Sequence, residues 1–199
     1  EHITTPLVAN VKVKDAIVDR IKAKKTIRPD SGPDLSKAVV HLHWMEERAE
    51  IFLDTSGETL AKHGYRKHPG KAPMLEALAT STILATQWDG KSPFVNPMCG
   101  SGTLAIEAAL MAQKRMPGLQ RMNYSFMHFI GYDEEVFFEE RRILKEQTEK
   151  ANLPEIIASD ISELAIDAAI ANAKTAGVEH LIKFEVCDFA ESTIPTQPG

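Results

Sequence analysis

A glycine-rich turn is the first feature of this sequence that could bind a ligand. It reads Asn96-Pro97-Met98-Cys99-Gly100-Ser101-Gly102-Thr103 and joins an apolar, strand-like segment to a helix-like one. Glycine permits positive φ angles and leaves no Cβ between the backbone and a ligand. The helix that follows directs its free N–H groups and positive dipole end at the turn. The turn therefore predicts a site for a nucleotide-like ligand, although a tight turn without a ligand has the same spacing.

Two aspartates follow later strand-like segments in the same way. Asp160 ends the segment IIASD, and Asp188 directly follows KFEVC. A carboxylate at the end of a second parallel strand can accept hydrogen bonds from both ribose hydroxyls of a nucleoside. Asp188 could accept from an adenine amino group. Asp160 could instead be a helix N-cap, a role for which Ser162 competes, and Asp188 could be a turn residue.

The elements around these residues alternate between strand and helix, which predicts βαβ units and a parallel sheet. Pro73 suits the first turn of a helix, and Gly177 suits its place after the last turn of another. We expect strands at 93–96, 156–160 and 183–187, helices at 73–87, 103–114, 133–151 and 162–176, and an irregular aromatic segment at 119–131. Leu104, Ala108 and Met111 are expected on the buried face of the helix over 103–114.

The first third of the chain predicts a different arrangement. Residues 11–25 have Val13, Ile17, Val18 and Ile21 at helical spacing, and residues 38–44 and 49–54 have the composition of two strands of a hairpin. A helix and a hairpin are too little for an independent core, so we expect part of a larger α+β module. Residues 61–73 are polar and basic and are expected to form a linker.

Composition narrows the class of protein. The hydrophobic and charged fractions, 43% and 26%, are ordinary for a globular protein, and no apolar run is long enough to span a bilayer. The start of the chain has no signal-peptide pattern, and the only cysteines are Cys99 and Cys187, so we expect a cytoplasmic location. The net charge is −5, but basic residues are concentrated in residues 1–73, where a polyanion could bind.

Three further groups of side chains are candidates for a site. His41 and His43 alternate on a strand without other residues at metal-ligand spacing, so no metal site is expected. Cys99 lies at a helix N-terminus but has no paired histidine, which favours a small turn residue over a nucleophile. Arg66, Lys67 and Lys71 lie in a basic run that either contacts nucleic-acid phosphates or is simply solvated.

Longer stretches of the sequence resemble a known family. NPMCGSGTLAIEAALMA, IASDISELAIDAAIANAKTAGV and FEVCDF are similar to the three cofactor motifs of class I methyltransferases in the THUMP-containing rRNA guanine-N2 methyltransferase family. LDTSGETLAKHGYRKHPGKAPM resembles the junction between the THUMP module and the catalytic domain of that family. The resemblance covers nearly the whole chain. The junction DTSG…GYR and the turn NPMCGSGT together are far more specific than a glycine-rich loop alone.

The resemblance implies a cofactor, S-adenosylmethionine, and a role for each matching residue. Asn96, Pro97, Cys99, Gly100, Ser101, Gly102 and Thr103 would surround the methionine and ribose portions of the cofactor. Asp160 would bind the ribose hydroxyls, with Ile161 against the adenine. Asp188 would meet the adenine amino group, with Phe189 beside it. The family often has aspartate where this chain has Asn96, which keeps the hydrogen-bonding shape without the charge.

One expected motif is missing. Amino methyltransferases of this type carry an Asn/Asp-Pro-Pro-Tyr/Phe motif after the fourth strand, which holds the target amine and stacks on the base. Residues 1–199 contain no such motif, so no catalytic residue is expected within them. The resemblance therefore implies the cofactor-binding half of a longer enzyme.

Together these expectations describe an α/β, Rossmann-like class I methyltransferase fold preceded by part of an α+β THUMP module. The expected domains are the C-terminal part of the THUMP module at 1–60, a linker at 61–73, and the N-terminal part of the methyltransferase domain at 74–199. The expected function is methylation of a guanine N2 amine in 23S ribosomal RNA, with ribosomal RNA as the partner.

Several alternatives stay open. The target could be tRNA or DNA adenine, or the protein could bind RNA with an inactive methyltransferase half. An NAD-dependent oxidoreductase could show the same strand-end signals, but Leu104 and Ala105 follow Thr103 where the third glycine of the NAD fingerprint would stand.

Overall fold

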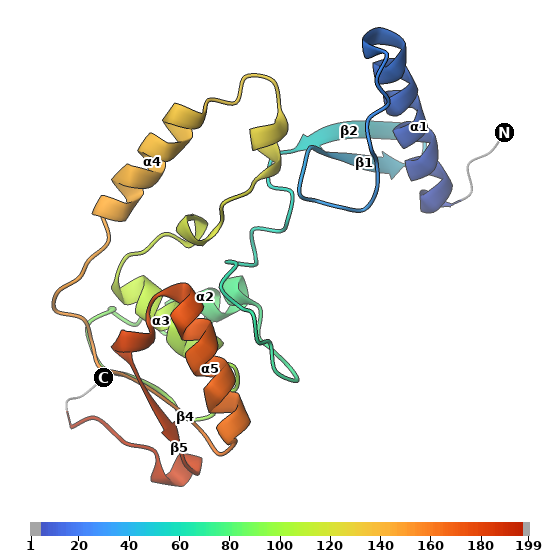
Figure 1. Ribbon diagram of the computed structural model, residues 1–199. Coiled ribbons are helices and arrows are strands. Elements are labelled where there is room, and N and C mark those ends of the chain that lie inside the picture. The colour runs from blue at the N-terminus through green and yellow to red at the C-terminus, as the bar shows by residue number, and fades with distance from the viewer. Residues whose placement is uncertain (1–4, 197–199) are drawn as a thin grey trace. The chain divides into compact units, whose positions relative to one another are not determined.

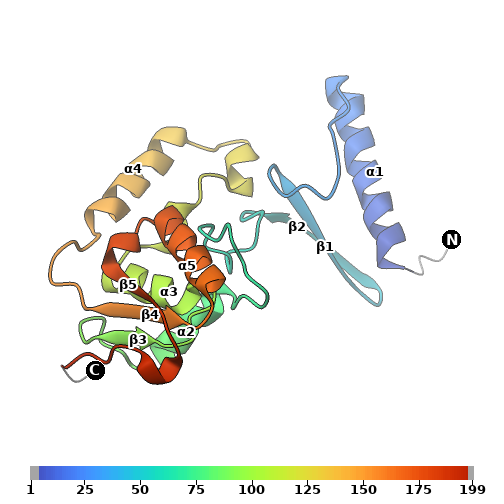
Figure 2. The same cartoon turned by 60° about the horizontal axis from the view of Figure 1, so that its bottom comes forward.

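The computed structural model describes residues 5–196 and divides them into two compact units. The first unit consists of residues 5–58 together with 123–132, and the second of residues 59–122 with 133–196. The chain therefore leaves the second unit and returns to it. Figures 1 and 2 label the elements of both units.

The first unit contains a long helix and a hairpin. α1 (Pro6–Lys25) begins after Thr5, whose side chain accepts from the N–H of Val8, and it ends at Thr26 in the left-handed conformation. Strands β1 (Val39–Met45) and β2 (Arg48–Asp54) pair antiparallel around a tight turn. The helix and both strands agree with the sequence-based expectation within a few residues, except that the helix starts earlier.

The apolar residues of α1 are less buried than the sequence suggests. Val18 is buried as expected, whereas Ile21 is exposed, and Ala9 is the other buried residue of the helix. A single two-stranded hairpin offers too little apolar surface to cover a five-turn helix.

A short segment from later in the chain completes the first unit. This segment contains the short helix η2 (Ser125–His128). The similar short helix η1 (Pro117–Gln120) precedes it in the second unit, and both overlap the stretch 119–131 expected to be irregular. Ser125 is fully buried, and its hydroxyl accepts from the N–H of Val39 at 2.9 Å. The N–H of Phe126 donates to the carbonyl of Thr55 at 3.1 Å. These aromatic-rich residues thus lie along the end of the hairpin.

The second unit is built on a three-stranded parallel sheet. Its order is β3 (Phe94–Asn96), β4 (Ile156–Asp160) and β5 (Ile182–Val186). Val95 is in register with Ile157, and Ala158 with Phe184. The strand positions and the parallel pairing confirm the expected α/β, Rossmann-like organisation of this part.

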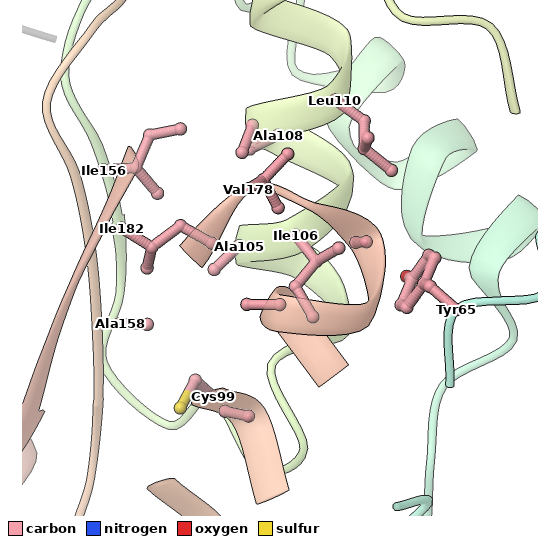
Figure 3. Close-up of a cluster of buried hydrophobic side chains, with 14 of the residues drawn as sticks. Tyr65, Cys99, Ala105, Ile106, Ala108, Leu110, Ile156, Ala158, Val178 and Ile182 are labelled. Carbon is pink, nitrogen blue, oxygen red and sulfur yellow. The ribbon is translucent and has the colours of Figure 1, made fainter. Parts of the chain in front are cut away.

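Helices pack on this sheet and on one another. α3 (Thr103–Ala112) follows β3, and α5 (Glu163–Ala176) follows β4. As expected, Ser162 caps the N-terminus of α5, and Gly177, in the left-handed conformation, caps its C-terminus. Both helices contribute to one hydrophobic core with β4 and β5, shown in Figure 3. The remaining helical elements are α2 (Glu76–Ala85), which packs against α3, α4 (Glu134–Glu146), η3 (Glu179–Leu181) and η4 (Phe189–Glu191).

α3 is buried on almost every side, not along the single stripe expected from its sequence. Ala105, Ile106, Ala109 and Leu110 are buried as well as Ala108, whereas Leu104 and Met111 are only partly buried. The reason is that α3 packs against the strands as well as against both α2 and α5. A helix that is apolar on all faces is typical of such a central position.

Candidate functional site

The predicted site residues gather where three parallel strands end. Asn96 ends β3 and Asp160 ends β4, while Asp188 lies two residues beyond β5. Because neighbouring parallel strands share one direction, their carboxyl ends meet at the same edge of the sheet, which is where open α/β sheets bind ligands. The structure thus brings the glycine turn and both aspartates to this edge.

The two glycines of the turn have different surroundings. Both have positive φ angles, +53° at Gly100 and +85° at Gly102. A Cβ added to Gly100 would meet no described atom within 4 Å, so this part of the turn borders open space. A Cβ on Gly102 would lie 2.8 Å from the Cβ of Ala169. Gly100 therefore leaves room for a ligand, whereas Gly102 allows α3 to pack closely on α5.

Asp160 holds the turn as well as facing it. Its Oδ2 atom accepts from the N–H of Gly100 at 2.9 Å, and its Oδ1 atom accepts from the N–H of Ser162 at 3.0 Å. The N-cap of α5 is Ser162, whose hydroxyl accepts from the N–H of Ala165. Asp160 is therefore not the helix cap, and its half-exposed carboxylate retains lone pairs for two further donors.

Apolar side chains flank the two aspartates. Ile161 is 73% exposed and Phe189 is 64% exposed. The carboxylate of Asp188 accepts from the N–H of Ala190 at 2.9 Å and so starts η4. A carboxylate beside an exposed ring and an exposed aliphatic group can bind a flat heterocycle that carries an amino group.

Asn96 and Cys99 line the interior of the turn. Asn96 is 8% exposed, and its buried Oδ1 atom has no hydrogen-bond partner among residues 5–196. Such an orphaned acceptor is costly unless a ligand satisfies it. Burial, reinforced by the charge of Asp160, raises the pKa of the Cys99 thiol to about 12. Cys99 is therefore a neutral packing residue at ordinary pH, as expected of a small turn residue.

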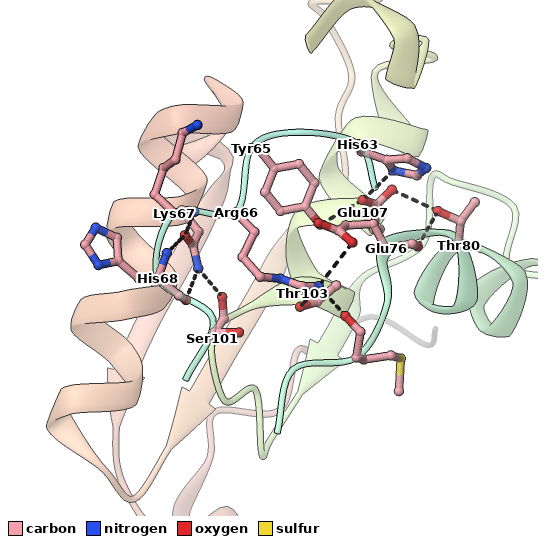
Figure 4. A network of polar contacts seen from close by, with 12 residues as sticks. His63, Tyr65, Arg66, Lys67, His68, Glu76, Thr80, Ser101, Thr103 and Glu107 are labelled. Atoms are coloured by element: carbon pink, nitrogen blue, oxygen red, sulfur yellow. Dashed lines mark hydrogen bonds and ion pairs between the residues drawn. The ribbon is translucent and has the colours of Figure 1, made fainter. Parts of the chain in front are cut away.

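The basic segment expected to be a linker is instead part of the second unit. Tyr65 is 1% exposed and belongs to the hydrophobic core. Arg66 is a candidate phosphate contact in the sequence, but its guanidinium turns inward, where it donates to the carbonyl of Met74 and to the hydroxyl of Thr103 (Figure 4). It also lies 3.5 Å from the buried carboxylate of Glu76. Lys67 and Lys71 are exposed, as a phosphate contact requires.

Sequence reasoning missed a buried polar cluster behind the turn. Glu107 of α3 is 1% exposed and accepts from the hydroxyl of Tyr65 at 2.7 Å and from the hydroxyl of Thr80 at 2.8 Å (Figure 4). His63 Nδ1 lies 2.8 Å from the same carboxylate. The signal in the sequence is a single acidic residue within the otherwise apolar LAIEAALMA.

Other kinds of site are absent from the described chain. Between residues 5 and 196, no group of three or more His, Cys, Asp or Glu side chains is arranged to hold a metal ion. Over the same residues, no helix combines the length and apolar character that crossing a membrane requires.

Comparison with known proteins assigns the second unit. Residues 63–197 match the model of the UPF0020 family, the RMKL-like methyltransferase domain. The chain belongs to this family. The match to a methyltransferase domain, together with the similarity to a structure solved with S-adenosylhomocysteine, shows that S-adenosylmethionine is the cofactor of this RMKL-like domain.

Solved structures resemble the RMKL-like chain over almost all its length. SMU.472, described as a methyltransferase and solved with S-adenosylhomocysteine, is 29% identical, with a TM-score of 0.77 over 94% of this chain and 49% of its own. A protein from Clostridium difficile 630, described as a methylase, is 33% identical, with the same TM-score and coverage. A Listeria monocytogenes protein, described as a predicted N6-adenine-specific DNA methylase, is 31% identical, with a TM-score of 0.77 over 92% and 48%. The chain spans about half the length of these structures.

The residues at the strand ends fit S-adenosylmethionine. Its sugar hydroxyls are donors that match the free lone pairs of Asp160, and its adenine matches the exposed Phe189 and Ile161 beside Asp188. Open space at Gly100 and the unpartnered acceptor of Asn96 suit the polar remainder of the cofactor.

Proposed function

We propose that this chain is the cofactor-binding part of an enzyme that methylates the N2 amine of a guanine in 23S ribosomal RNA. The observation that carries the proposal is the hydrogen bond from the N–H of Gly100 to Asp160, which joins the turn to the ribose-binding acid at one strand edge. S-adenosylmethionine supplies an electrophilic methyl group when bound. The resemblance of LDTSG…HGYR to the family junction supports the ribosomal target.

Within this proposal each residue has one task. Asp160 orients the ribose, Asp188 accepts from the adenine amino group, and Ile161 and Phe189 enclose the ring. Asn96, Cys99, Gly100, Ser101 and Thr103 form the wall around the methionine portion. Such fixed orientation of the donor is the main contribution that a protein makes to a direct methyl displacement. The groups that orient the target amine belong to the Asn-Pro-Pro-Tyr type of motif, which residues 1–199 do not contain.

The first unit has a matching role in the proposal. Its helix and hairpin suit part of a THUMP module over residues 1–60, which would bind RNA while the second unit holds the cofactor. The net acidic charge of the chain favours this separation, because the phosphate contacts would come from the basic N-terminal third and from Lys67 and Lys71.

Calorimetry with the full-length protein tests the cofactor assignment. We expect S-adenosylhomocysteine to bind and NAD not to bind. Replacing Asp160 with alanine should weaken binding at least about tenfold, because the ribose hydroxyls lose a charged acceptor. Asp167→Ala is the matched control, since Asp167 is an exposed aspartate of the same α5 region. Tight binding of NAD, or an unchanged affinity of Asp160→Ala, contradicts the assignment.

A methyl-transfer assay then tests the target. The full-length protein should transfer labelled methyl groups to unmodified 23S ribosomal RNA, with the label recovered as N2-methylguanine after nuclease digestion. Transfer to DNA adenine is the second candidate, favoured by the similarity to the protein described as a predicted N6-adenine-specific DNA methylase. Label recovered only as N6-methyladenine in DNA would replace the first candidate by the second.

A further inference from the structure

Asn172 is a fully buried polar residue in the middle of α5. Its exposed fraction is 0%, and its side chain makes four hydrogen bonds. The Oδ1 atom accepts from the N–H groups of Lys67 and His68, both at 2.9 Å. The Nδ2 atom donates to the carbonyl of His68 at 2.8 Å and to the carbonyl of Ser101 at 3.1 Å. This amide therefore uses both of its N–H donors and both lone pairs of its oxygen on backbone groups.

These hydrogen bonds join two segments with different tasks. Ser101 lies in the glycine turn, whereas Lys67 and His68 begin the exposed cationic loop, which we define as residues 67–71. The loop lies against the turn, because a Cβ added to Gly70 would be 3.8 Å from the Cβ of Ser101. Figure 4 shows Lys67 and His68 beside Ser101 at the α5 helix.

Only an amide suits this position. A leucine of similar size would leave two N–H groups and two carbonyls without partners in the interior. An aspartate would keep the acceptor for Lys67 and His68 but would set a charged oxygen against the carbonyl of Ser101. Asparagine is also a weak helix former, so helix propensity does not explain its presence within AIANAKTA.

We propose that Asn172 is a positioning residue that holds the cationic loop against the glycine turn, so that the loop binds nucleic-acid phosphates at a fixed place relative to the methyl donor. The inference rests on the proposed function and deepens it. Lys67 and Lys71 supply the charge, and the clamp on the backbone of Lys67 and His68 lowers the entropy cost of ordering the loop when a phosphodiester chain binds. The same amide fixes the carbonyl of Ser101 and thereby the path of the turn.

The test compares variants of the full-length protein in two titrations. S-adenosylhomocysteine binding is measured by calorimetry, and binding of a labelled RNA hairpin from 23S ribosomal RNA by fluorescence anisotropy over a series of salt concentrations. Asn172→Ala should weaken both by about tenfold and lower the salt slope of RNA binding. The double variant Lys67→Ala/Lys71→Ala should weaken RNA binding alone. Thr175→Ala, an exposed position on the same helix, should change neither.

The salt slope of RNA binding distinguishes a loop that is no longer held in place from a protein that is only less stable. A destabilised protein has a smaller folded fraction but the same number of phosphate contacts, so its slope is unchanged. A folded Asn172→Ala protein with wild-type affinities and slope overturns the inference. Wild-type protein that binds RNA and S-adenosylhomocysteine, together with such an Asn172→Ala result, leaves the proposed function standing. Wild-type protein that binds neither ligand refutes the proposed function itself.

A measurement on the wild-type protein covers the case in which Asn172→Ala does not fold. The amides of Lys67 and His68 donate to Asn172, so their hydrogen exchange reports the clamp directly. Saturation with S-adenosylhomocysteine should slow their exchange, because the ligand stabilises the turn to which the clamp is attached. Unchanged exchange of both amides in the saturated protein contradicts the inference.

Discussion

Gly102 and Ala169 bring the start of α3 against the middle of α5. A Cβ on Gly102 would come within 2.8 Å of the Cβ of Ala169, whereas one on Gly100 would meet no described atom within 4 Å. The first of these glycines serves packing and the second borders the site. The spacing Gly-x-Gly in the sequence does not distinguish these two tasks.

Alanine substitution should therefore separate the two glycines. Gly102→Ala should lower the free energy of unfolding by roughly 2–4 kcal/mol, because it adds overpacking to a left-handed backbone conformation. Gly100→Ala should lower it by only about 1–2 kcal/mol, from backbone strain alone, but should weaken S-adenosylhomocysteine binding strongly. Urea denaturation and calorimetry measure the two effects. The prediction is wrong if both variants lose stability equally and Gly100→Ala binds the ligand normally.

The hydrogen bond between Tyr65 and Glu107 should stabilise the domain. Burial and the Glu107 carboxylate raise the pKa of the Tyr65 hydroxyl, so that hydroxyl stays a donor across the accessible pH range. Tyr65→Phe removes one donor from a buried carboxylate and should cost about 1–3 kcal/mol in urea denaturation. Ser81→Ala, which removes an exposed hydroxyl from α2, is the control and should change the free energy of unfolding little. Equal changes in the free energy of unfolding for Tyr65→Phe and Ser81→Ala would show that the hydrogen bond between Tyr65 and Glu107 does not stabilise the domain.

The thiol of Cys99 should react slowly in the native protein. Its pKa is raised to about 12 by burial and by Asp160, and its side chain is 8% exposed. In a Cys187→Ser background, alkylation by iodoacetamide at neutral pH should be much slower than in urea, because little thiolate is present and access is poor. Peptide mass spectrometry follows the modified cysteine. Rapid native labelling of Cys99 would mean that the turn opens readily.

Glu185 should make stability depend on pH at the acidic end. Its hydrogen bond with Lys183, together with two from Thr193, lowers the pKa of the Glu185 carboxyl from 4.5 to about 2. A group whose pKa is lower in the folded state stabilises above its unfolded pKa, and this contribution is lost as pH falls from 4.5 towards 2. Glu185→Gln should therefore be less stable than wild type at neutral pH, and the difference should shrink near pH 2. A difference that is constant across this range in urea denaturation contradicts the prediction.

Local patterns in the sequence predicted the elements of the second unit well. Ser162 and Gly177 mark the ends of α5 because capping depends on residues within one turn. The position of Asp160 at a strand end is also a local feature, because the apolar run before it has the length and composition of a buried strand. These features need no knowledge of distant parts of the chain.

The features that sequence reasoning missed all depend on long-range contacts. Arg66 belongs to a basic run and looks solvated, but its partners Thr103 and Glu76 lie elsewhere in the chain. Asn172 pairs with Lys67, more than a hundred residues earlier. No periodicity records such pairs. The only local sign is a lone polar residue among alanines or aliphatic residues, as at Asn172 and Glu107.

The segment 123–132 has a consequence for synthesis on the ribosome. Although most of the first unit is translated early, the buried Ser125 that pairs with Val39 is made some eighty residues later, after the strand that carries the glycine turn. During translation the end of the hairpin near Val39 and Thr55 therefore stays uncovered until this segment leaves the exit tunnel. The first unit can thus be completed only after residues 59–122 of the second unit have been translated, so the synthesis of the two units is interleaved.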